Sequence, residues 1–101
     1  MNIELRHLRY FVAVAEESGF TAAARRAHVT QQVLSAQIRQ LENAVGTALL
    51  ERTSRGVVLT AAGSAFLEVA REILASLDRG VAAARNAARA VSGRLTVGLS
   101  A

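Results

Sequence analysis

The side chains best suited to chemistry in this chain are amides, hydroxyls and arginines in its first half. Helical spacing places Gln32, Ala36 and Arg39 on one face, with Ser35 beside them. That face carries no carboxylate before Glu42, whereas a solvated helix usually mixes acidic and basic residues. Amides and hydroxyls hydrogen-bond base edges, and arginine binds phosphate and guanine. The pattern predicts a surface that reads duplex DNA.

Two helices are predicted ahead of this surface. Residues 5–17 are expected to form the first, which Ser18 and Gly19 end. Thr21 is expected to cap a second, alanine-rich helix that ends at Ala27. The alanines either allow another helix to cross closely or reflect helix propensity alone. The side chains expected to face inward from the first helix are Leu5, Leu8, Phe11, Val12 and Ala15.

A turn and a third helix are predicted to carry the polar face. His28 and Val29 form the turn, and Thr30 is a good N-cap for a helix over residues 31–45. Gly46 is expected to end that helix in the left-handed conformation. The buried stripe of the helix is predicted to be Leu34, Ile38, Leu41 and Val45. Helix, turn and longer helix together outline a helix-turn-helix.

A small hairpin is predicted next. Leu49–Arg52 and Val57–Thr60 alternate as short strands do, with Ser54, Arg55 and Gly56 at the tip. The hairpin would bring two arginines, Arg52 and Arg55, beside the third helix. The expected fold class is therefore mainly α: a winged helix-turn-helix over residues 1–60, of three helices and a two-stranded wing, followed by a long dimerisation helix.

The long helix is predicted to begin after Thr60 and to reach about Val91, within a segment spanning residues 61–92. Thirty residues of helix would be roughly 45 Å long, too long to lie on one small domain. Its apolar stripe therefore needs another cover, and a second copy of the helix is the simplest. Gly80 is expected to mark a bend or a close crossing. The residues expected to dimerise are Phe66, Ala70, Ile73, Leu77, Val81, Ala84 and Ala88.

The last residues are predicted to change structure. Ser92 and Gly93 are expected to stop the helix, and residues 93–101 to form a strand that has no partner here. Because a lone strand is unstable, the expected explanation is that the chain is cut from a longer protein at the first strand of a second domain. The alternative is an unstructured tail.

Composition limits the possible functions. The chain has 101 residues, enough for one small domain, and 51% hydrophobic residues, enough for a core. Its net charge is +4, and all 12 basic residues are arginine, which favours a polyanionic partner or reflects a GC-rich genome. Without cysteine and with two histidines, neither a metal site nor a catalytic constellation is expected, so an enzyme is not predicted. No signal peptide or long apolar run is visible, which predicts a soluble cytoplasmic protein with no membrane partner.

The whole chain resembles the N-terminal part of a LysR-type transcriptional regulator. The similarity lies in three segments: LRHLRYFVAVAEESGFTAAARRAHVTQQVLSAQIRQLENAVG, then LLERTSRGVVLTAAG, and then the long helix with GRLTVGLSA. The resemblance implies a winged helix-turn-helix, an antiparallel homodimer through the linker helix, and a C-terminal effector domain of which only the first strand is present. It also implies tetramers of the full-length protein, a small-molecule inducer of unknown identity bound outside this fragment, and no cofactor within it.

The resemblance assigns roles residue by residue. Thr30 and Gln31 match the start of the family's recognition helix, Ser35 and Gln37 its polar contacts, and Arg39 a phosphate-facing position. Arg52 and Arg55 match the wing. Two positions depart: Gln32 stands where Pro or Ser is usual, and Ala36 where many members have a base-reading Arg. The expected DNA-binding set is Thr30, Gln31, Gln32, Ser35, Ala36, Gln37, Arg39, Arg52 and Arg55, with Arg25 or Arg26 on the second helix.

These residues predict how a duplex would be bound. Gln31, Gln32 and Ser35 are expected to contact bases, with Ala36 offering a methyl contact to thymine. Thr30, Arg39 and Arg25 or Arg26 would neutralise the backbone, and Arg55 would reach a phosphate or the minor groove. Other roles stay open for four of them: Arg25 and Arg26 as solvated charges, Ser35 as a hydrogen-bond donor to the Gln31 carbonyl, and Gln37 as packing at the helix flank. The predicted function is sequence-specific transcription regulation by a dimer at an inverted repeat; the alternatives are a non-specific architectural DNA-binding protein and a helical protein-interaction module.

Overall fold

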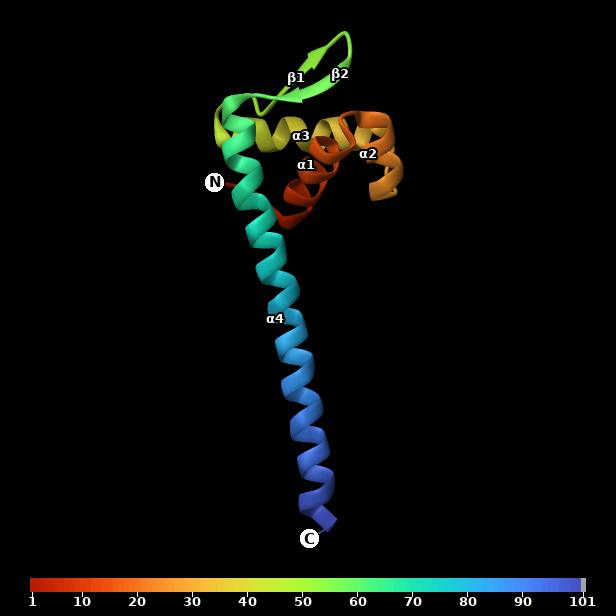
Figure 1. Ribbon diagram of the computed structural model, residues 1–101, viewed down its shortest axis with the longest axis vertical. Helices are drawn as coiled ribbons and strands as arrows, with labels where there is room; N and C mark the ends of the chain where they lie inside the picture. The colour runs from red at the N-terminus through yellow and green to blue at the C-terminus, as the bar shows by residue number, and fades with distance from the viewer. Residues whose placement is uncertain (101) are drawn as a thin grey trace.

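Three helices and a hairpin form a head from which a long helix projects (Figure 1). The computed structural model describes the backbone of residues 1–100 and the side chains of residues 1–91. Its arrangement confirms the predicted fold class, a mainly helical winged helix-turn-helix followed by a long helix. The elements are α1 (Leu5–Glu17), α2 (Phe20–Ala27), α3 (Gln31–Val45), β1 (Leu50–Thr53), β2 (Gly56–Leu59) and α4 (Ala61–Ser100).

The junctions on either side of α2 are left-handed turns. Ser18 ends α1 with φ 57°, and His28 ends α2 with φ 59°, as turn residues do. The prediction that Thr21 caps α2 is wrong, because Gly19 is the N-cap and the helix starts two residues earlier than a cap at Thr21 would give. Thr21 therefore lies within the first turn, where its hydroxyl is available to another side chain.

Both predicted caps of α3 are confirmed. The Thr30 side-chain oxygen accepts a hydrogen bond from the Val33 amide at 3.1 Å, which satisfies a first-turn donor that would otherwise lack a partner. Gly46 ends the helix with φ 92°, a conformation that glycine adopts without a Cβ clash. Leu34, Ile38 and Leu41 are buried as predicted, so the opposite side of α3 remains outside.

The core lies where α1, α2, α3 and the start of α4 meet. Phe11 and Leu34 are fully buried, and Ala23 and Ala24 are 0% and 4% exposed. Small side chains on α2 thus allow α1 to pack closely, which decides between the two interpretations of the alanine run. The prediction that Leu5 faces inward is wrong. Leu5 is 42% exposed, because it opens α1 before the helix reaches the core.

The wing is an antiparallel hairpin whose strands are shifted by one residue from the prediction. Leu50 pairs with Leu59 and Thr53 with Gly56, so the turn consists of Ser54 and Arg55. Each strand therefore lies one residue nearer the tip than predicted, and at the base of the hairpin the Thr60 amide still donates to the Leu49 carbonyl at 3.0 Å, beyond the last strand pair. Thr60 also caps α4 as predicted, its hydroxyl oxygen accepting from the Gly63 amide at 2.9 Å.

Gly63 lets α4 approach the wing closely. A Cβ at this position would overlap the carbonyl oxygen of Leu49 and press on the Leu59 side chain. Leu49 is itself fully buried at the base of the wing. The first turn of α4 and the wing therefore form one packed unit, and the direction of the wing depends on the missing side chain at Gly63.

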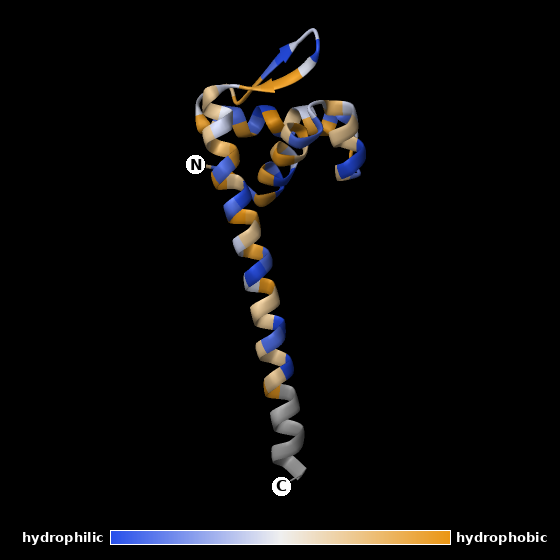
Figure 2. Cartoon of the chain, viewed as in Figure 1, coloured by the Kyte–Doolittle hydropathy of each residue, from blue (hydrophilic) through white to orange (hydrophobic). Residues whose placement is uncertain are grey.

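The long helix α4 leaves the head after about four turns, beyond Leu74. The molecule measures 68 × 25 × 20 Å, and its radius of gyration is 18.7 Å, compared with about 13 Å for a compact chain of this length. Phe66 and Ala70 were predicted to dimerise, but they pack on the head of their own chain: Ala70 is fully buried, and the Phe66 ring meets Phe11 edge-on at 5.6 Å. Beyond them Ile73 and Val81 are 42% and 40% exposed, and apolar residues continue along the projecting helix (Figure 2).

The predicted end of α4 is wrong. The helix runs through Ser92 and Gly93 to Ser100, so residues 93–100 form no strand; Ala101 lies outside the described residues. A strand needs a neighbouring strand for its backbone hydrogen bonds, whereas each residue added to an existing helix supplies its own. Across the described part of the chain, no helix has the length and apolarity required to span a bilayer.

Candidate nucleic-acid interface

The outward face of α3 forms a shallow polar surface. Gln31, Gln32, Ala36 and Arg39 are exposed, and Ser35 is half-buried. These five residues line one open hollow of about 330 Å³, and no carboxylate is among them. Because Leu34 and Ile38 anchor the opposite face in the core, the orientation of this surface is fixed by packing. The structure thus brings together the base-reading residues predicted from the sequence.

Two hydrogen bonds order the start of this surface. Gln31 Nε2 donates to Thr21 Oγ1 at 2.9 Å, which ties the first side chain of α3 to α2. The Thr30 oxygen caps the helix, and a hydroxyl that accepts through oxygen keeps its own hydrogen to donate. Thr30 and the free amides of the first turn can therefore hold an anion together with the positive end of the helix dipole.

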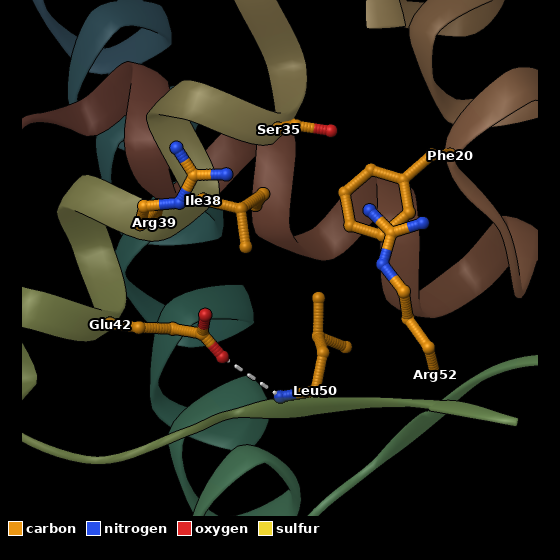
Figure 3. Close-up of a pocket in the computed structure, with 7 residues that line it drawn as sticks. All are labelled: Phe20, Ser35, Ile38, Arg39, Glu42, Leu50 and Arg52. Carbon is orange, nitrogen blue, oxygen red and sulfur yellow. Dashed lines mark hydrogen bonds between the residues drawn. The ribbon is translucent and has the colours of Figure 1, made fainter. Parts of the chain in front are cut away.

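Arg52 lies beside α3 on the wing. Its guanidinium carbon is 4.4 Å from the centre of the Phe20 ring, at the start of α2, a distance that allows a cation–π contact. Arg52, Ser35 and Arg39 border a pocket of about 200 Å³ between α3 and β1 (Figure 3). The wing therefore contributes a positive charge to the same side of the molecule as the polar face of α3.

Arg55 occupies the turn of the wing. Thr53 Oγ1 accepts from the Arg55 amide at 3.2 Å and donates to the Gly56 carbonyl at 3.3 Å, so a threonine hydroxyl holds the turn. Within the described side chains, the Arg55 guanidinium has no ion pair or hydrogen bond, and the residue is exposed. Arg55 is consequently available at the tip of the hairpin.

Two predicted DNA-binding residues have partners within the protein, and a third lies apart from the hollow on α3. Arg26 is bound by two carboxylates of α1, with its NH2 group 2.8 Å from Glu16 and its NH1 group 3.2 Å from Glu17. Gln37 points to the flank of α3, where its Oε1 accepts from Arg6 Nε at 3.0 Å. Arg25 is exposed on α2, away from the hollow on α3.

Glu16 links three helices through its arginine partners. The hydrogen bond from Arg26 lowers the pKa of the Glu16 carboxyl below its ordinary value; partial burial opposes this shift, and Arg71 reinforces it. Arg71 on α4 reaches the second carboxylate oxygen at 3.0 Å. A single carboxylate of α1 thus holds both α2 and the projecting helix.

The supporting roles of three residues escaped the sequence analysis. Thr21 holds Gln31, Phe20 lies under Arg52, and Glu42 accepts hydrogen bonds from the Leu49 and Leu50 amides at 2.7 and 3.2 Å. Each acts on a different element from its own, so helical spacing gave no signal for it. In the part of the chain that the structure describes, no group of three or more His, Asp or Glu side chains could hold a metal ion.

The fold and this surface define a winged helix-turn-helix with a projecting helix. Residues 5–64 match the family model described as "Bacterial regulatory helix-turn-helix protein, lysR family". The chain therefore belongs to the LysR family.

Individual relatives agree with this assignment. The chain is 51% identical over 100 residues to the uncharacterized HTH-type transcriptional regulator YnfL of Escherichia coli (strain K12), covering 99% of this chain and 34% of that protein. It is 52% identical over 93 residues to the regulator TfdT of Cupriavidus pinatubonensis, covering 92% of this chain and 41% of that protein. The chain thus spans less than half the length of these relatives.

A solved structure supports the fold. The crystal structure of a CbnR DBD–DNA complex superposes with a TM-score of 0.81 at 50% sequence identity, covering 85% of this chain and 99% of that one. The duplex in that structure is bound by the CbnR domain.

Proposed function

We propose that this chain is the DNA-binding part of a sequence-specific transcription regulator. The observation that carries the proposal is the outward face of α3, where amides, a hydroxyl and an arginine line one hollow without a carboxylate. An arginine-bearing wing adjoins this face. The CbnR relative in complex with DNA supports a duplex as the partner.

The N-terminal half of α3 enters the major groove in this proposal. Gln32 and Ser35 hydrogen-bond base edges, and Ala36 offers its methyl group to thymine. Gln31 keeps a carbonyl oxygen and one N–H for a base while its other N–H is held by Thr21. Thr30 contacts a phosphate, and Arg25, rather than the carboxylate-bound Arg26, is the backbone contact from α2.

The exposed stripe on α4 makes a homodimer the second part of the proposal. It begins at Ile73, next to Leu74, the last residue of α4 that packs on the core, and continues through Leu77, which is half-buried, and the exposed Val81, Ala84 and Ala88. A two-fold dimer would read an inverted repeat whose half-sites lie about one helical turn, or a multiple of it, apart. The proposal also places the action of the regulator on the chromosome in the cytoplasm. It includes tetramers of the whole regulator and an inducer that binds outside this chain.

Two substitutions test the division between base reading and backbone binding. Gln32→Ala should relax base preference at one or two positions of the site, because it removes an amide from the groove-facing surface. Arg55→Ala should weaken binding to every sequence and reduce the dependence of affinity on salt, because it removes a charge contact. Fluorescence anisotropy titrations on a selected duplex and a scrambled duplex, at several salt concentrations, measure both.

The same titrations separate the alternatives. If each substitution weakens binding to the selected and the scrambled duplex equally, the division between base reading by Gln32 and backbone binding by Arg55 is contradicted. Comparable affinity of the unsubstituted protein for both duplexes would favour a non-specific architectural protein. No binding to any duplex at low salt, by protein shown to be folded, would leave the protein-interaction module as the better explanation.

A further inference from the structure

The Gln31 side chain is fixed at both of its ends. Its backbone begins α3, where the Thr30 oxygen caps the first turn by accepting from the Val33 amide at 3.1 Å. Its amide group is bound by a different helix, because Gln31 Nε2 donates to Thr21 Oγ1 at 2.9 Å. Thr21 lies in the first turn of α2, so α2 and α3 together determine where this amide points.

The next residue, Gln32, provides a contrast. Both glutamines are exposed, and both line the hollow on α3. Among the side chains that the structure describes, however, the Gln32 amide takes part in no hydrogen bond. A free amide can turn over about its last side-chain torsion and thereby exchange its donor and its acceptor. Gln31 therefore presents a more defined pattern of donors and acceptors than Gln32 does.

The bond to Thr21 determines what the Gln31 amide still offers to a base. A glutamine amide has two N–H donors and one carbonyl oxygen. Because one N–H is bound to Thr21, one donor and the carbonyl oxygen remain. In the major groove adenine presents a donor, its N6 amino group, beside an acceptor, N7, whereas guanine presents two acceptors, O6 and N7. The remaining groups of Gln31 fit adenine, but they would set the carbonyl oxygen against a guanine acceptor that then lacks a partner.

We propose that Thr21 makes Gln31 selective for adenine over guanine at one position of each half-site. The proposal rests on the DNA-binding function proposed above and names the base that this position selects. Adenine N6 donates to Gln31 Oε1, and adenine N7 accepts from the remaining Gln31 N–H. Thr21 acts only through Gln31, so it is a positioning residue and contacts no base itself.

The opposite orientation of the amide would give the opposite selectivity. A threonine hydroxyl can donate as well as accept, so a reversed Gln31 amide would bind Thr21 through Oε1. Both N–H groups would then face the groove, and two donors suit guanine O6 and N7. In the structure it is Nε2 that lies 2.9 Å from Thr21 Oγ1. The base preferred at this position therefore shows which end of the amide Thr21 holds.

Binding of DNA should strengthen the bond between Thr21 and Gln31. Both side chains are exposed in the free chain, where water competes for their hydrogen bonds. A duplex that covers the start of α3 removes this water, and a hydrogen bond is stronger in the lower dielectric of an interface. Loss of the bond should therefore change the base preference more than the stability of the free protein.

Substitution of Thr21 combined with base exchange tests the proposal. The duplex is selected by this protein from a random pool. The position read by Gln31 is the one whose preference disappears in Gln31→Met, a variant of similar length without an amide. There the wild type should bind adenine at least about fivefold more tightly than guanine, the lower limit for a bidentate contact. Thr21→Val removes the hydroxyl and should reduce this preference to about twofold or less, while preferences at other positions remain. Competition titrations followed by fluorescence anisotropy measure each preference.

Two variants and one base analogue serve as controls. Thr21→Ser keeps the hydroxyl and should keep the preference for adenine. Thr47→Val makes the same change at an exposed residue after α3 and should leave every preference unchanged. Replacing the selected adenine by 7-deazaadenine removes only the N7 acceptor, so it should weaken binding by the wild type more than binding by Thr21→Val. Circular dichroism confirms that each variant is folded.

Three outcomes would count against the proposal or its basis. A preference for guanine at the Gln31 position would overturn the proposed selectivity and assign Oε1 to the bond with Thr21. An undiminished preference for adenine in Thr21→Val would overturn the role of Thr21 while leaving base reading by Gln31 intact. Failure of the wild type to bind any duplex would instead overturn the proposed function.

Discussion

Single side chains that bridge elements hold the reading surface in place. Glu42 joins α3 to the wing, Thr21 joins α2 to α3, and Glu16 joins α1 to both α2 and α4. None of them belongs to the hollow on α3 itself. The orientation of that surface therefore depends on polar contacts made one layer behind it, in addition to the apolar core.

Glu16 gives the first stability prediction. Because Arg26 and then Arg71 lower the pKa of Glu16 in the folded state, this carboxylate stabilises the fold above its ordinary pKa of 4.5, and the contribution is lost as pH falls through the folded-state value. Glu16→Gln should therefore lower the free energy of unfolding at pH 7 by up to about 1 kcal/mol, the range of exposed ion pairs. Urea denaturation of both proteins at neutral and acid pH measures this.

The pH dependence distinguishes this effect from general loss of charge. The difference in free energy of unfolding between wild type and Glu16→Gln should narrow as pH falls below 4.5 and the carboxyl, whose pKa Arg26 lowers, becomes protonated. Glu68→Gln, at an exposed position of α4, is the matched control and should change stability little. If the difference in free energy of unfolding between the two proteins stays constant down to acid pH, the ion pairs of Glu16 contribute nothing to stability.

Local chemistry explains which residues could be predicted. Thr30 and Gly46 were assigned correctly because a cap acts within one turn of its own helix. Arg26 and Gln37 were assigned to DNA because they are polar and lie near the expected surface, but their partners, Glu16 and Arg6, come from α1. Spacing along the sequence does not reveal a partner that only the tertiary fold brings near.

At the scale of elements, α4 serves two purposes along its length. Its first four turns complete the core through Phe66, Leu67, Ala70 and Leu74. Its later turns carry apolar residues that the head does not cover. The sequence predicted one continuous stripe, since periodicity records which face is apolar and cannot tell which partner covers it. A larger side chain at the start of α4 and one in its middle should therefore have opposite effects on the free energy of unfolding.

The same substitution at two glycines of α4 tests this division. Gly63→Ala should lower the free energy of unfolding by about 1–3 kcal/mol, because its Cβ would overlap the Leu49 carbonyl. At Gly80→Ala the Cβ meets nothing within 4 Å in this chain, so helix propensity should raise stability by about 1 kcal/mol. Urea denaturation at low protein concentration, where any dimer dissociates, measures both.

A concentration series extends the test to a partner helix. If Gly80→Ala stabilises the dilute protein but weakens its self-association, another helix crosses closely at this position. If it destabilises the dilute protein, the mid-helix contact lies within one chain and the division of α4 proposed here is incorrect.

At the scale of the whole molecule, a head of three helices and a wing is attached to a rod that extends the chain to 68 Å. The apolar stripe of the rod begins at Ile73 and includes Leu77, which is half-buried, and Val81 and Val91, which are exposed. A solvent-exposed helix would not need apolar residues at this spacing, and two such helices can bury them against each other. Pairing of the rods would fix the distance between two heads, and with it the spacing of half-sites.

Association through the rod can be tested by placing one charge in the stripe. Leu77→Asp should convert a dimer to a monomer, because pairing would bury an uncompensated carboxylate. Ala75→Asp introduces the same charge on the opposite side of α4 and should leave the dimer intact. Sedimentation velocity over a range of concentrations gives the oligomeric state of each protein, and circular dichroism confirms that α4 remains helical.

The same variants connect association to DNA binding. A Leu77→Asp monomer keeps its head unchanged, since Leu77 lies beyond the part of α4 that packs on the core. It should bind a single half-site as the wild type does, but lose the gain in affinity that two linked heads obtain on an inverted repeat. Equal affinity of both proteins for the full repeat would show that the heads act independently. A monomeric wild type would show that the apolar stripe has another partner.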